Sequence, residues 1–416
     1  MSETIKIEEI QEKVILIGVS LQESDDTEES LEELKDLVKT AGAITLDTVI
    51  QKRDKYHPGT YIGKGKIEEV AELVDRLGAT GVVCDDELSP AQLRNLEEML
   101  GTKVMDRTLV ILDIFAKRAS TSEGKIQVEL AQLKYSMARL VGLRSSLSKL
   151  GGGIGTRGPG EKKLEMDRRL VKDRVAQLRK ELDEVERHRE VARGQRSKNT
   201  APIAAIVGYT NAGKSTLLNT LTGAGVLEED KLFATLDPTT RILELPSKQQ
   251  ILLTDTVGFI RKLPHHLIEA FKSTLEEAKY SDVIIHVVDA SSDQMEKQMH
   301  IVYETLDSLG IKDKPIITLF NKQDKLEKKI QLRDLKADVT LDISAKSGEG
   351  LDQLQEQLED ILRKKNILVE RLFPYDQAGK IQLIRKYGEL LEEDYQSDGI
   401  YVKAYVPMKI YESVVN

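Results

Sequence analysis

The sequence predicts a multidomain α/β protein, and three observations carry that prediction. Its 416 residues exceed the roughly 250 to 300 at which a single hydrophobic core stops growing. Strand-like and helix-like stretches alternate at the start of the chain and again after residue 199, which is typical of largely parallel sheets. Between them lies a long stretch with coiled-coil periodicity. We therefore expect four units, at residues 1–116, 117–198, 199–365 and 366–416.

The first unit is expected to be an α/β domain with a parallel sheet, and the fourth a small α+β domain. Strand candidates in the first unit are Lys13 to Val19, Ala43 to Ile50, Gly81 to Asp85 and Lys103 to Arg107. Ser89-Pro90 supplies an N-cap and a first-turn proline for the helix before the last strand. The fourth unit shows a strand at Ile367 to Phe373, a helix around Ile381 to Glu393 and a strand at Ile400 to Val406.

The second unit is expected to be a long antiparallel helical hairpin. Apolar residues recur in steps of four and three, which is the spacing of a coiled-coil seam. The first run is Ile126, Leu130, Leu133, Met137 and Leu140, and the second is Leu164, Val171, Val175, Leu178, Leu182 and Val185. Six of the ten residues 151–160 between the runs are glycine. This tip is therefore either mobile or closely approached by another backbone.

Charge is distributed unevenly along the chain. The net charge of −9 consists of −12 in residues 1–116, +10 in residues 117–198 and −7 in residues 199–416. The hairpin tip carries Arg144, Lys149, Arg157, Lys162 and Lys163. Such a charge run is most often a solvated face. The alternative is a phosphate-contacting finger, because a basic segment on an acidic protein suits a nucleic acid partner.

Composition excludes several classes of protein. The N-terminus is polar, and no apolar run approaches the roughly 20 residues that cross a bilayer. We therefore expect a soluble, cytoplasmic protein. The one cysteine, Cys84, cannot form an intrachain disulfide, and no Cys/His grouping has metal-site spacing.

The third unit contains a phosphate-binding motif between a strand and a helix. The buried strand "IAAIV" at 203–207 runs directly into "GYTNAGKS" at 208–215 and then into a helical stretch. Backbone N–H groups of such a loop bind phosphate oxygens. Lys214 would neutralise the β and γ phosphates, and the Ser215 hydroxyl would ligate Mg²⁺. This order of elements predicts a P-loop nucleotide site.

Three later motifs have separate roles in the same site. In "DTVG" at 255–258, Asp255 can hold the Mg²⁺ shell and the Gly258 N–H can reach the γ phosphate. In "NKQD" at 321–324, Asp324 can accept the N1 and N2 protons of guanine, a pattern that adenine lacks. "SAK" at 344–346 supplies a backbone donor for guanine O6. The expected ligands are GTP and GDP, so the third unit is expected to be a P-loop GTPase G domain.

Two further positions concern hydrolysis. In "FATLDPTT" at 233–240, a threonine should complete the Mg²⁺ shell; Thr235 is preferred, and Thr239 and Thr240 compete. Phe259 follows "DTVG", where many GTPases of the Ras type place a water-orienting glutamine. Phenylalanine has no hydrogen-bonding group, so we expect slow intrinsic turnover that a partner accelerates. His265 and His266 are expected at a solvent-facing helix start and are not assigned as bases.

The predicted site residues follow from these motifs. The catalytic residues are Lys214, Thr235, Asp255 and Gly258, and the metal ligands are Ser215 and Thr235. The nucleotide contacts are Gly208, Tyr209, Thr210, Asn211, Ala212, Gly213, Lys214, Ser215, Phe233, Ala234, Thr235, Leu236, Asp237, Asp255, Thr256, Val257, Gly258, Asn321, Lys322, Gln323, Asp324, Ser344, Ala345 and Lys346.

The chain resembles the HflX family of ribosome-associated GTPases. The resemblance rests on "GGGIGTRGPGE", "GYTNAGKSTLLN", "FATLDPTTR", "DTVGFI" and, in the first unit, "YIGKGK", and it covers most of the chain. It implies binding to the large ribosomal subunit and its rRNA, with the hairpin reaching toward the catalytic centre. It also implies a role in splitting or rescue of stalled ribosomes, and the GTP and Mg²⁺ contacts named above.

Two details of the resemblance have open alternatives. In similar translation-related GTPases an asparagine at the position of Asn211 helps to bind K⁺; shaping of the loop is the other interpretation. The family also suggests ATP-dependent activity of the first unit, for which "GKGK" at Gly63 to Lys66 is the candidate. A turn that caps the next helix is the alternative, because short Gly-Lys strings begin many helices.

Two rival functions are consistent with the residues. One is a nucleotide-operated enzyme acting on tRNA, although no covalent nucleophile lies beside a candidate substrate pocket. The other is a signalling switch that recruits proteins through the hairpin. We also expect a monomer, because a hairpin that pairs with itself needs no second subunit.

Overall fold

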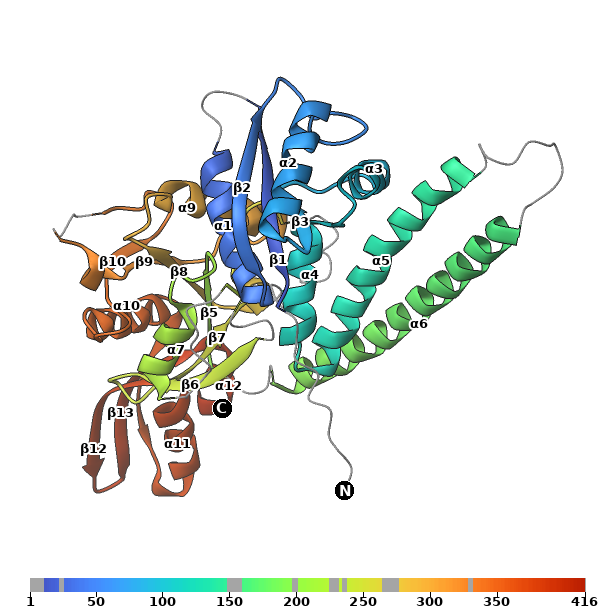
Figure 1. Cartoon of the computed structure of the whole chain (residues 1–416). Coiled ribbons are helices and arrows are strands. Elements are labelled where there is room, and N and C mark those ends of the chain that lie inside the picture. Colours follow the sequence, from blue (N-terminus) through green and yellow to red (C-terminus); the bar gives the residue numbers. More distant parts are fainter. Residues whose placement is uncertain are drawn as a thin grey trace, which may run out of the picture. The chain divides into compact units, whose positions relative to one another are not determined.

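The protein is described by a computed structural model of the whole chain, whose elements are labelled in Figure 1. The structure describes residues 11–21, 26–147, 159–196, 201–223, 232–233, 238–263, 277–327 and 332–415. The chain forms two compact units: Met1–Leu182 with Arg261–Ala270, and Asp183–Ile260 with Phe271–Asn416. A short segment that begins at Arg261 therefore belongs to the N-terminal unit.

The N-terminal unit contains the predicted parallel sheet, whose four strands lie in the order β2-β1-β3-β4. Its strands are β1 (Lys13–Ser20), β2 (Ile44–Lys52), β3 (Gly81–Cys84) and β4 (Lys103–Asp106). Its helices are α1 (Thr27–Ala41), α2 (Lys64–Leu77), α3 (Pro90–Leu100) and α4 (Arg107–Arg118). β1 is buried from Val14 to Ser20 because helices cover both faces of the sheet. The strand order reverses between β1 and β3.

Side-chain caps define where two of these helices begin. Ser89 and Gln92 form a reciprocal capping box at the start of α3, as the Ser89-Pro90 pair predicts. Asp106 caps α4 by accepting a hydrogen bond from the Leu109 amide at 3.0 Å. Helix α4 was not predicted from the sequence, because most of its residues are buried and its apolar side chains show no one-sided helical periodicity.

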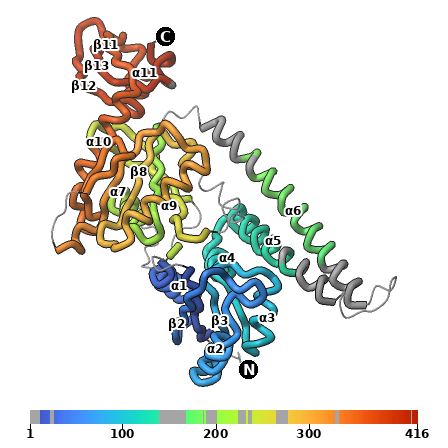
Figure 2. Tube along the Cα trace, turned by 90° about the horizontal axis from the view of Figure 1, so that it is seen from above, coloured from blue at the N-terminus to red at the C-terminus, as the bar shows by residue number. Residues whose placement is uncertain are grey.

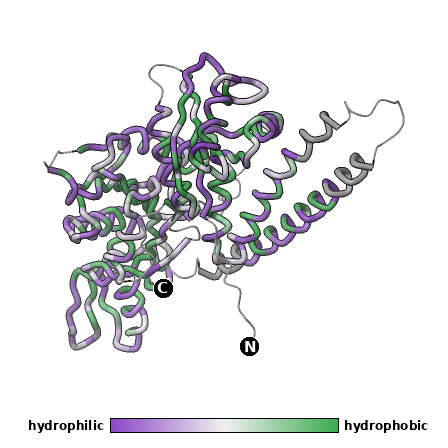
Figure 3. Tube along the Cα trace, viewed as in Figure 1, coloured by the Kyte–Doolittle hydropathy of each residue, from purple (hydrophilic) through white to green (hydrophobic). Residues whose placement is uncertain are grey.

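α5 (Ser122–Leu147) and α6 (Pro159–Arg196) form the predicted hairpin and lie side by side in Figures 1 and 2. Its described seam consists of Leu130, Val175 and Leu178, with Ile126, Leu133, Val171 and Leu182 packed against them. Arg174 donates to both carboxylate oxygens of Glu129 at 2.8 and 3.0 Å. Figure 3 shows hydrophobic and hydrophilic residues alternating along the helices. The side chains of Arg144, Lys149, Arg157, Lys162 and Lys163 lie outside the described residues.

The second unit contains a six-stranded sheet in the order β10-β9-β8-β5-β7-β6, in which β6 and β7 are antiparallel and the other described pairs are parallel. Its strands are β5 (Ile203–Gly208), β6 (Thr239–Glu244), β7 (Gln250–Asp255), β8 (Val283–Asp289), β9 (Ile316–Asn321) and β10 (Val339–Asp342). Its helices are α7 (Lys214–Thr222), α9 (Met295–Ser308), α10 (Leu351–Lys364) and the short 3-10 helix η1 (Gln323–Lys325). The parallel strands bring the loops with the predicted motifs to one edge.

The C-terminal part of this unit is an antiparallel sheet in the order β11-β13-β12, packed on two helices. Its elements are β11 (Asn366–Phe373), η2 (Tyr375–Gln377), α11 (Ala378–Tyr387), β12 (Glu389–Gln396), β13 (Gly399–Pro407) and α12 (Met408–Val415). The predicted helix around Ile381 to Glu393 is wrong in its second half. The chain is extended at Gly388, where a Cβ atom would lie 2.6 Å from the Tyr405 carbonyl oxygen, and then pairs with β13.

Candidate nucleotide site

The phosphate loop joins β5 to α7 and depends on glycine at both ends. Gly208 has a φ of 152°, and a Cβ atom there would lie 2.2 Å from the Val287 carbonyl oxygen. Gly213 has a φ of 99°, and a Cβ atom there would lie 2.2 Å from Asn321 Nδ2. A loop of this form presents backbone N–H groups and the N-terminus of α7, which is the geometry that binds phosphate.

Lys214 points back into this loop. Its ammonium group donates to the Tyr209 carbonyl oxygen at 2.8 Å, and only 6% of the residue is exposed. Burial lowers the pKa of Lys214 to about 8; Asp255 opposes this shift, and Lys322 adds to it. The loop therefore holds a cation with no fully compensating carboxylate, which favours an anionic ligand.

Ser215 and Asp255 meet beside the loop. Ser215 Oγ donates to Asp255 Oδ2 at 2.8 Å, and Asp255 lies at the end of β7, next to β5. A hydroxyl and a carboxylate supply the oxygen ligands that Mg²⁺ prefers, so these residues fit the predicted metal site. Thr235 lies outside the described residues, together with Ala234, Leu236 and Asp237. Phe233 is described and buried.

Gly258 and Phe259 lie against the phosphate loop. A Cβ atom at Gly258 would lie 2.8 Å from Thr210 Cα and 3.0 Å from Lys214 Nζ, so only glycine fits there. The Phe259 amide donates to the Gly208 carbonyl at 3.1 Å, and its carbonyl accepts from the Thr210 amide at 2.8 Å. The Phe259 side chain is only 2% exposed. It is part of the interior and cannot orient a water molecule.

The "NKQD" and "SAK" loops are tied to each other and to the phosphate loop. Asn321 Nδ2 donates to the Ala212 carbonyl at 2.8 Å, and Asn321 Oδ1 accepts from the Ala345 amide at 2.8 Å. Ser344 Oγ donates to Asp324 Oδ1 at 2.7 Å, and this hydrogen bond lowers the pKa of Asp324. The carboxylate of Asp324 is exposed and ionised, as an acceptor for guanine must be.

Three of the remaining predicted contacts have structural roles around these groups. Thr256 Oγ1 donates to the Ile206 carbonyl at 2.8 Å, and Gln323 is buried. Lys322 forms an ion pair with Asp289 at 2.7 Å. Sequence reasoning missed Asp289, although it ends the strand next to the phosphate-binding strand, and carboxyl ends of such strands commonly carry site residues. His265 and His266 lie outside the described residues.

The "GKGK" segment lies at the start of α2 in the N-terminal unit. Gly63 is the N-cap, and its amide donates to Gln51 Oε1 at 2.8 Å. Lys66 forms an ion pair with Glu69 at 2.7 Å. These contacts agree with the predicted helix-capping turn.

The fold and this site have the phosphate loop and the arrangement of motif loops that define the G-domain class of GTPases. Family models match residues 28–116 (GTP-binding GTPase N-terminal), 118–196 (GTP-binding GTPase Middle Region) and 203–322 (50S ribosome-binding GTPase). The chain is 68% identical over 416 residues to a GTPase HflX of Lacrimispora saccharolytica, covering 100% of this chain and 98% of that protein. It is 43% identical over 354 residues to GTPase HflX of Escherichia coli, covering 84% of this chain and 83% of that protein.

The chain belongs to the HflX family of GTPases, and its reaction is therefore the hydrolysis of GTP. GTPases of this family generally use Mg²⁺. A solved GTP-binding protein from Sulfolobus solfataricus in complex with GDP is 26% identical, with a TM-score of 0.45 over 85% of this chain and 99% of that one.

Two features of the described residues bear on ligands and membranes. None of the helices in this part of the chain has the length and apolar content needed to cross a membrane. The same residues contain no group of three or more His, Cys, Asp or Glu side chains that could hold a metal ion. Within this part of the chain the predicted metal ligand is the Ser215 hydroxyl, with the Asp255 carboxylate beside it, as in the P-loop arrangement.

Proposed function

We propose that this GTPase binds the large ribosomal subunit through its basic hairpin and acts in the splitting, rescue or recycling of ribosomes under stress. The observation that carries the proposal is the charge of +10 in residues 117–198, between segments of −12 and −7. The hairpin would gain affinity from rRNA phosphates, whereas the acidic segments oppose indiscriminate binding. The matched family description, 50S ribosome-binding GTPase, supports the same partner.

The proposed roles of the site residues are those that the motifs predict, and the contacts of the described residues support them. Lys214 neutralises the β and γ phosphates, and the Gly258 amide contacts the γ phosphate. Asp324 accepts from guanine N1 and N2, and a backbone amide of the "SAK" loop donates to O6. Ser215 and Thr235 are the metal ligands, with Asp255 in the surrounding shell. A bound Mg²⁺ would neutralise charge on the phosphates during transfer.

Hydrolysis is proposed to depend on the ribosomal partner. The buried Phe259 side chain has no group that could orient water, and it stands where many GTPases of the Ras type place a glutamine that does so. A second group supplied by the large subunit, or a rearrangement that this subunit induces, would complete the site. The GTP state would in turn control the association with the ribosome.

The decisive experiment is hydrolysis and sedimentation with isolated large subunits at matched salt. We expect a large stimulation of GTP hydrolysis and cosedimentation that is stronger with a non-hydrolysable GTP analogue than with GDP. Arg157→Gln with Lys149→Gln at the hairpin tip should weaken cosedimentation and its salt dependence. Lys35→Gln is the matched control, because Lys35 is an exposed lysine on α1 of the N-terminal unit.

Other outcomes would favour the rival functions. Unchanged hydrolysis and no cosedimentation would contradict the ribosomal role and leave the GTPase activity intact. Binding of the same hairpin to free tRNA, or capture of a protein through it, would then be tested directly.

Four finer predictions stay predictions. Binding of K⁺ at Asn211 predicts faster turnover in KCl than in NaCl. An ATP site at Gly63 to Lys66 predicts that changing Lys64 and Lys66 to Gln abolishes ATP binding without affecting GTP binding.

A monomer predicts a sedimentation mass of one chain. The division at residues 116, 198 and 365 predicts that proteolysis cuts near these positions.

A further inference from the structure

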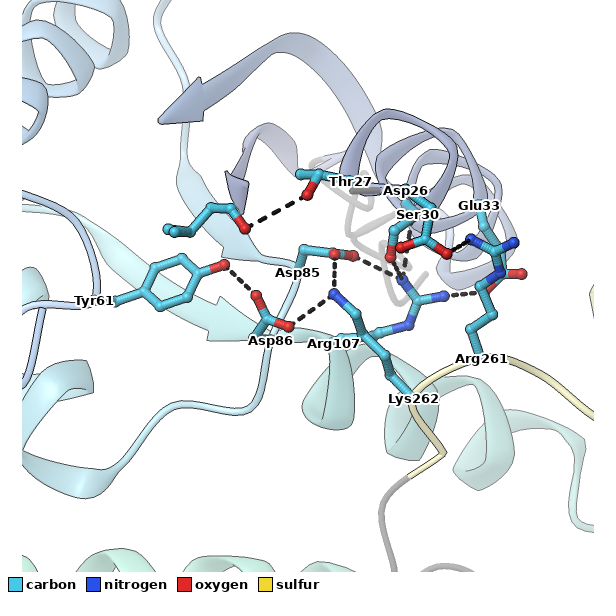
Figure 4. Close-up of polar contacts among 11 residues, drawn as sticks. Asp26, Thr27, Ser30, Glu33, Tyr61, Asp85, Asp86, Arg107, Arg261 and Lys262 are labelled. Atoms are coloured by element: carbon cyan, nitrogen blue, oxygen red, sulfur yellow. Dashed lines mark hydrogen bonds and ion pairs between the residues drawn. The ribbon is translucent and has the colours of Figure 1, made fainter. Parts of the chain in front are cut away.

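Two basic residues beyond the "DTVGFI" motif contact the N-terminal unit, to which they belong. Lys262 Nζ lies 2.5 Å from Asp85 Oδ2 and 2.7 Å from Asp86 Oδ1 (Figure 4). Arg261 forms an ion pair of 2.7 Å with Asp26. The segment that follows the predicted γ-phosphate contact is therefore anchored by three carboxylates.

These carboxylates lie where an open parallel sheet commonly binds its ligand. Asp85 and Asp86 directly follow β3, and Asp26 precedes α1, after β1. The strand order reverses between β1 and β3, and the crevice outside the carboxyl ends at such a point is the usual ligand site. Here the ammonium group of Lys262, from the same chain, lies beside the carboxyl end of β3.

The carboxylates are oriented by fixed partners. Arg107 is 1% exposed and donates to the other oxygen of Asp85 at 2.7 Å. The Tyr61 hydroxyl donates to the other oxygen of Asp86 at 2.5 Å. Each carboxylate therefore has one oxygen held by Arg107 or Tyr61 and one directed at Lys262, which is a built site for a single cation.

This arrangement gives a role to Tyr61, the first residue of "YIGKGK". Tyr61 is 2% exposed, and burial raises its pKa, so the hydroxyl is a permanent donor to Asp86. Burial alone would lower the pKa of Lys262, but Asp85 and Asp86 outweigh that effect and raise it. We assign Tyr61 as a positioning residue for Asp86.

Asp106, the last residue of β4, binds the first helix of the hairpin. Asp106, adjacent to Arg107, accepts from Arg139 at 2.8 Å and from the Tyr135 hydroxyl at 2.5 Å. Both donors lie on α5. Asp106 also accepts from the Leu88 amide at 3.0 Å, two residues beyond Asp86. The two neighbours Asp106 and Arg107 thus connect the Lys262 site with the hairpin helix.

We propose that the Asp85 and Asp86 site is a dock for Lys262 that couples the nucleotide state of the "DTVG" segment to the position of α5. The proposal rests on the proposed function of the nucleotide site and hairpin. Gly258 lies beside Lys214, and Lys262 follows it by only four positions, a span of at most about 14 Å. Lys262 has a φ of 51°, a backbone conformation that non-glycine residues seldom adopt. A small movement of the segment would therefore loosen the dock, and linkage makes the coupling reciprocal.

The test uses the full-length variants Lys262→Gln, Asp86→Asn and Tyr61→Phe. The first readout is the ratio of affinities for GDP and a non-hydrolysable GTP analogue, which should change about fivefold or more in Lys262→Gln. The second readout is hydrogen exchange of α5, which should differ between the two nucleotides in the wild type and not in Lys262→Gln. The double variant Lys262→Gln, Asp86→Asn should resemble the single variants, because the two residues act through one contact.

Lys248→Gln is the matched control. Lys248 also has a positive φ, of 68°, and forms an ion pair of 3.0 Å with Glu244. It should alter neither readout. A lower thermal stability of Lys262→Gln with both readouts unchanged would show that the ion pair is only structural, and would overturn the proposal. The proposal would also be overturned if hydrogen exchange of α5 in the wild type were the same with both nucleotides. Neither readout needs ribosomes, so failure of the ribosomal role would be recognised separately.

Discussion

The Ser215 hydroxyl donates a hydrogen bond of 2.8 Å to Asp255 Oδ2 and thereby joins the start of α7 to the end of β7. The two residues come from motifs that are 40 positions apart in the chain. Their contact places two oxygen-bearing groups, predicted separately, beside the same phosphate loop. A cation bound there would meet both groups without a large rearrangement.

Ser215→Ala should weaken nucleotide binding in the presence of Mg²⁺. The change removes one proposed metal ligand and leaves Asp255 without its hydroxyl donor. A lost hydrogen bond to a charged group is worth about 1.5 to 3 kcal/mol, so we expect a loss of about 10- to 100-fold in GDP affinity. Titration with fluorescent GDP, with Mg²⁺ and with EDTA, measures it. Thr222→Ala, later on the same helix, should behave like the wild type; a loss equally large in EDTA would contradict the metal role.

Nucleotide affinity should fall as the pH rises above about 8. Burial lowers the pKa of Lys214 to about 8 in the protein without nucleotide, and bound phosphates favour its charged form. Below pH 8 the ammonium group is already protonated, and affinity is constant. Above it, binding must take up a proton, so affinity decreases by up to about tenfold per pH unit.

Lys214→Arg is the control for this pH dependence. Arginine stays charged, so this variant should bind more weakly at every pH but lack the additional decline above pH 8. Isothermal titration between pH 7 and 9 compares the two proteins. Parallel curves would show that Lys214 does not titrate in this range.

Much of the nucleotide site could be predicted because each motif has a fixed local geometry. The strand, glycine-rich loop and helix place Lys214 and Ser215, and the ends of parallel strands place Asp255 and Asn321. What could not be predicted is how these groups hold one another. Asn321 connects the phosphate loop to Ala345, and the Phe259 backbone forms a hydrogen bond with Gly208. Neither contact is indicated by a recognisable spacing of residues in the sequence.

Asp324→Asn should change the base preference of the site. An amide nitrogen would meet the N–H donors of guanine, so GDP affinity should fall about 100-fold or more, at 1.5 to 3 kcal/mol per charged hydrogen bond. Xanthine carries a carbonyl oxygen at C2, so the variant should prefer xanthosine diphosphate. Competition between the two nucleotides measures the preference. Asp313→Asn, an exposed position before β9, should leave it unchanged, and a variant that still prefers GDP would contradict the assignment.

Stability should depend on pH through His286. Burial lowers its pKa to about 4, and its Nδ1 makes no hydrogen bond within the described residues. The unfolded chain has an ordinary histidine pKa of about 6.5. Between these values the unfolded state binds more protons, so the free energy of unfolding falls as the pH drops, by up to about 1.4 kcal/mol per pH unit.

His286→Gln should lose this part of the pH dependence. Urea unfolding at pH 7, 6 and 5 gives the slope for each protein. The variant should be less stable at pH 7, because a polar group replaces a ring packed edge-on against Tyr303 at 5.2 Å. Equal slopes in the two proteins would contradict a buried neutral histidine.

The N-terminal and C-terminal parts show which structural features sequence patterns can predict and which they cannot. The strands of the first sheet could be predicted because each is a short apolar run between helices. The ion pairs of Lys262 with Asp85 and Asp86 could not, because they join residues 177 and 176 positions apart and have no spacing signal. In the C-terminal part, Leu390 and Leu391 fit a helical pattern, but pairing with β13 decided the conformation.

Phe259→Gln tests whether the missing water-orienting group can simply be restored. The Phe259 backbone is held by hydrogen bonds to Gly208 and Thr210, and the side chain is directed into the interior. A glutamine there would leave a buried amide without a partner and a partly empty site. We therefore expect no increase in the turnover of the isolated protein and a loss of about 2 to 5 kcal/mol in stability.

Single-turnover hydrolysis and urea unfolding measure the two effects of this substitution. Phe259→Leu is the control: it keeps an apolar side chain, should cost less stability and should not change turnover. A several-fold faster Phe259→Gln protein of unchanged stability would show that position 259 can reach the γ phosphate after all. The proposed dependence on the large subunit would then need another cause, because the protein could complete its own site with one side chain.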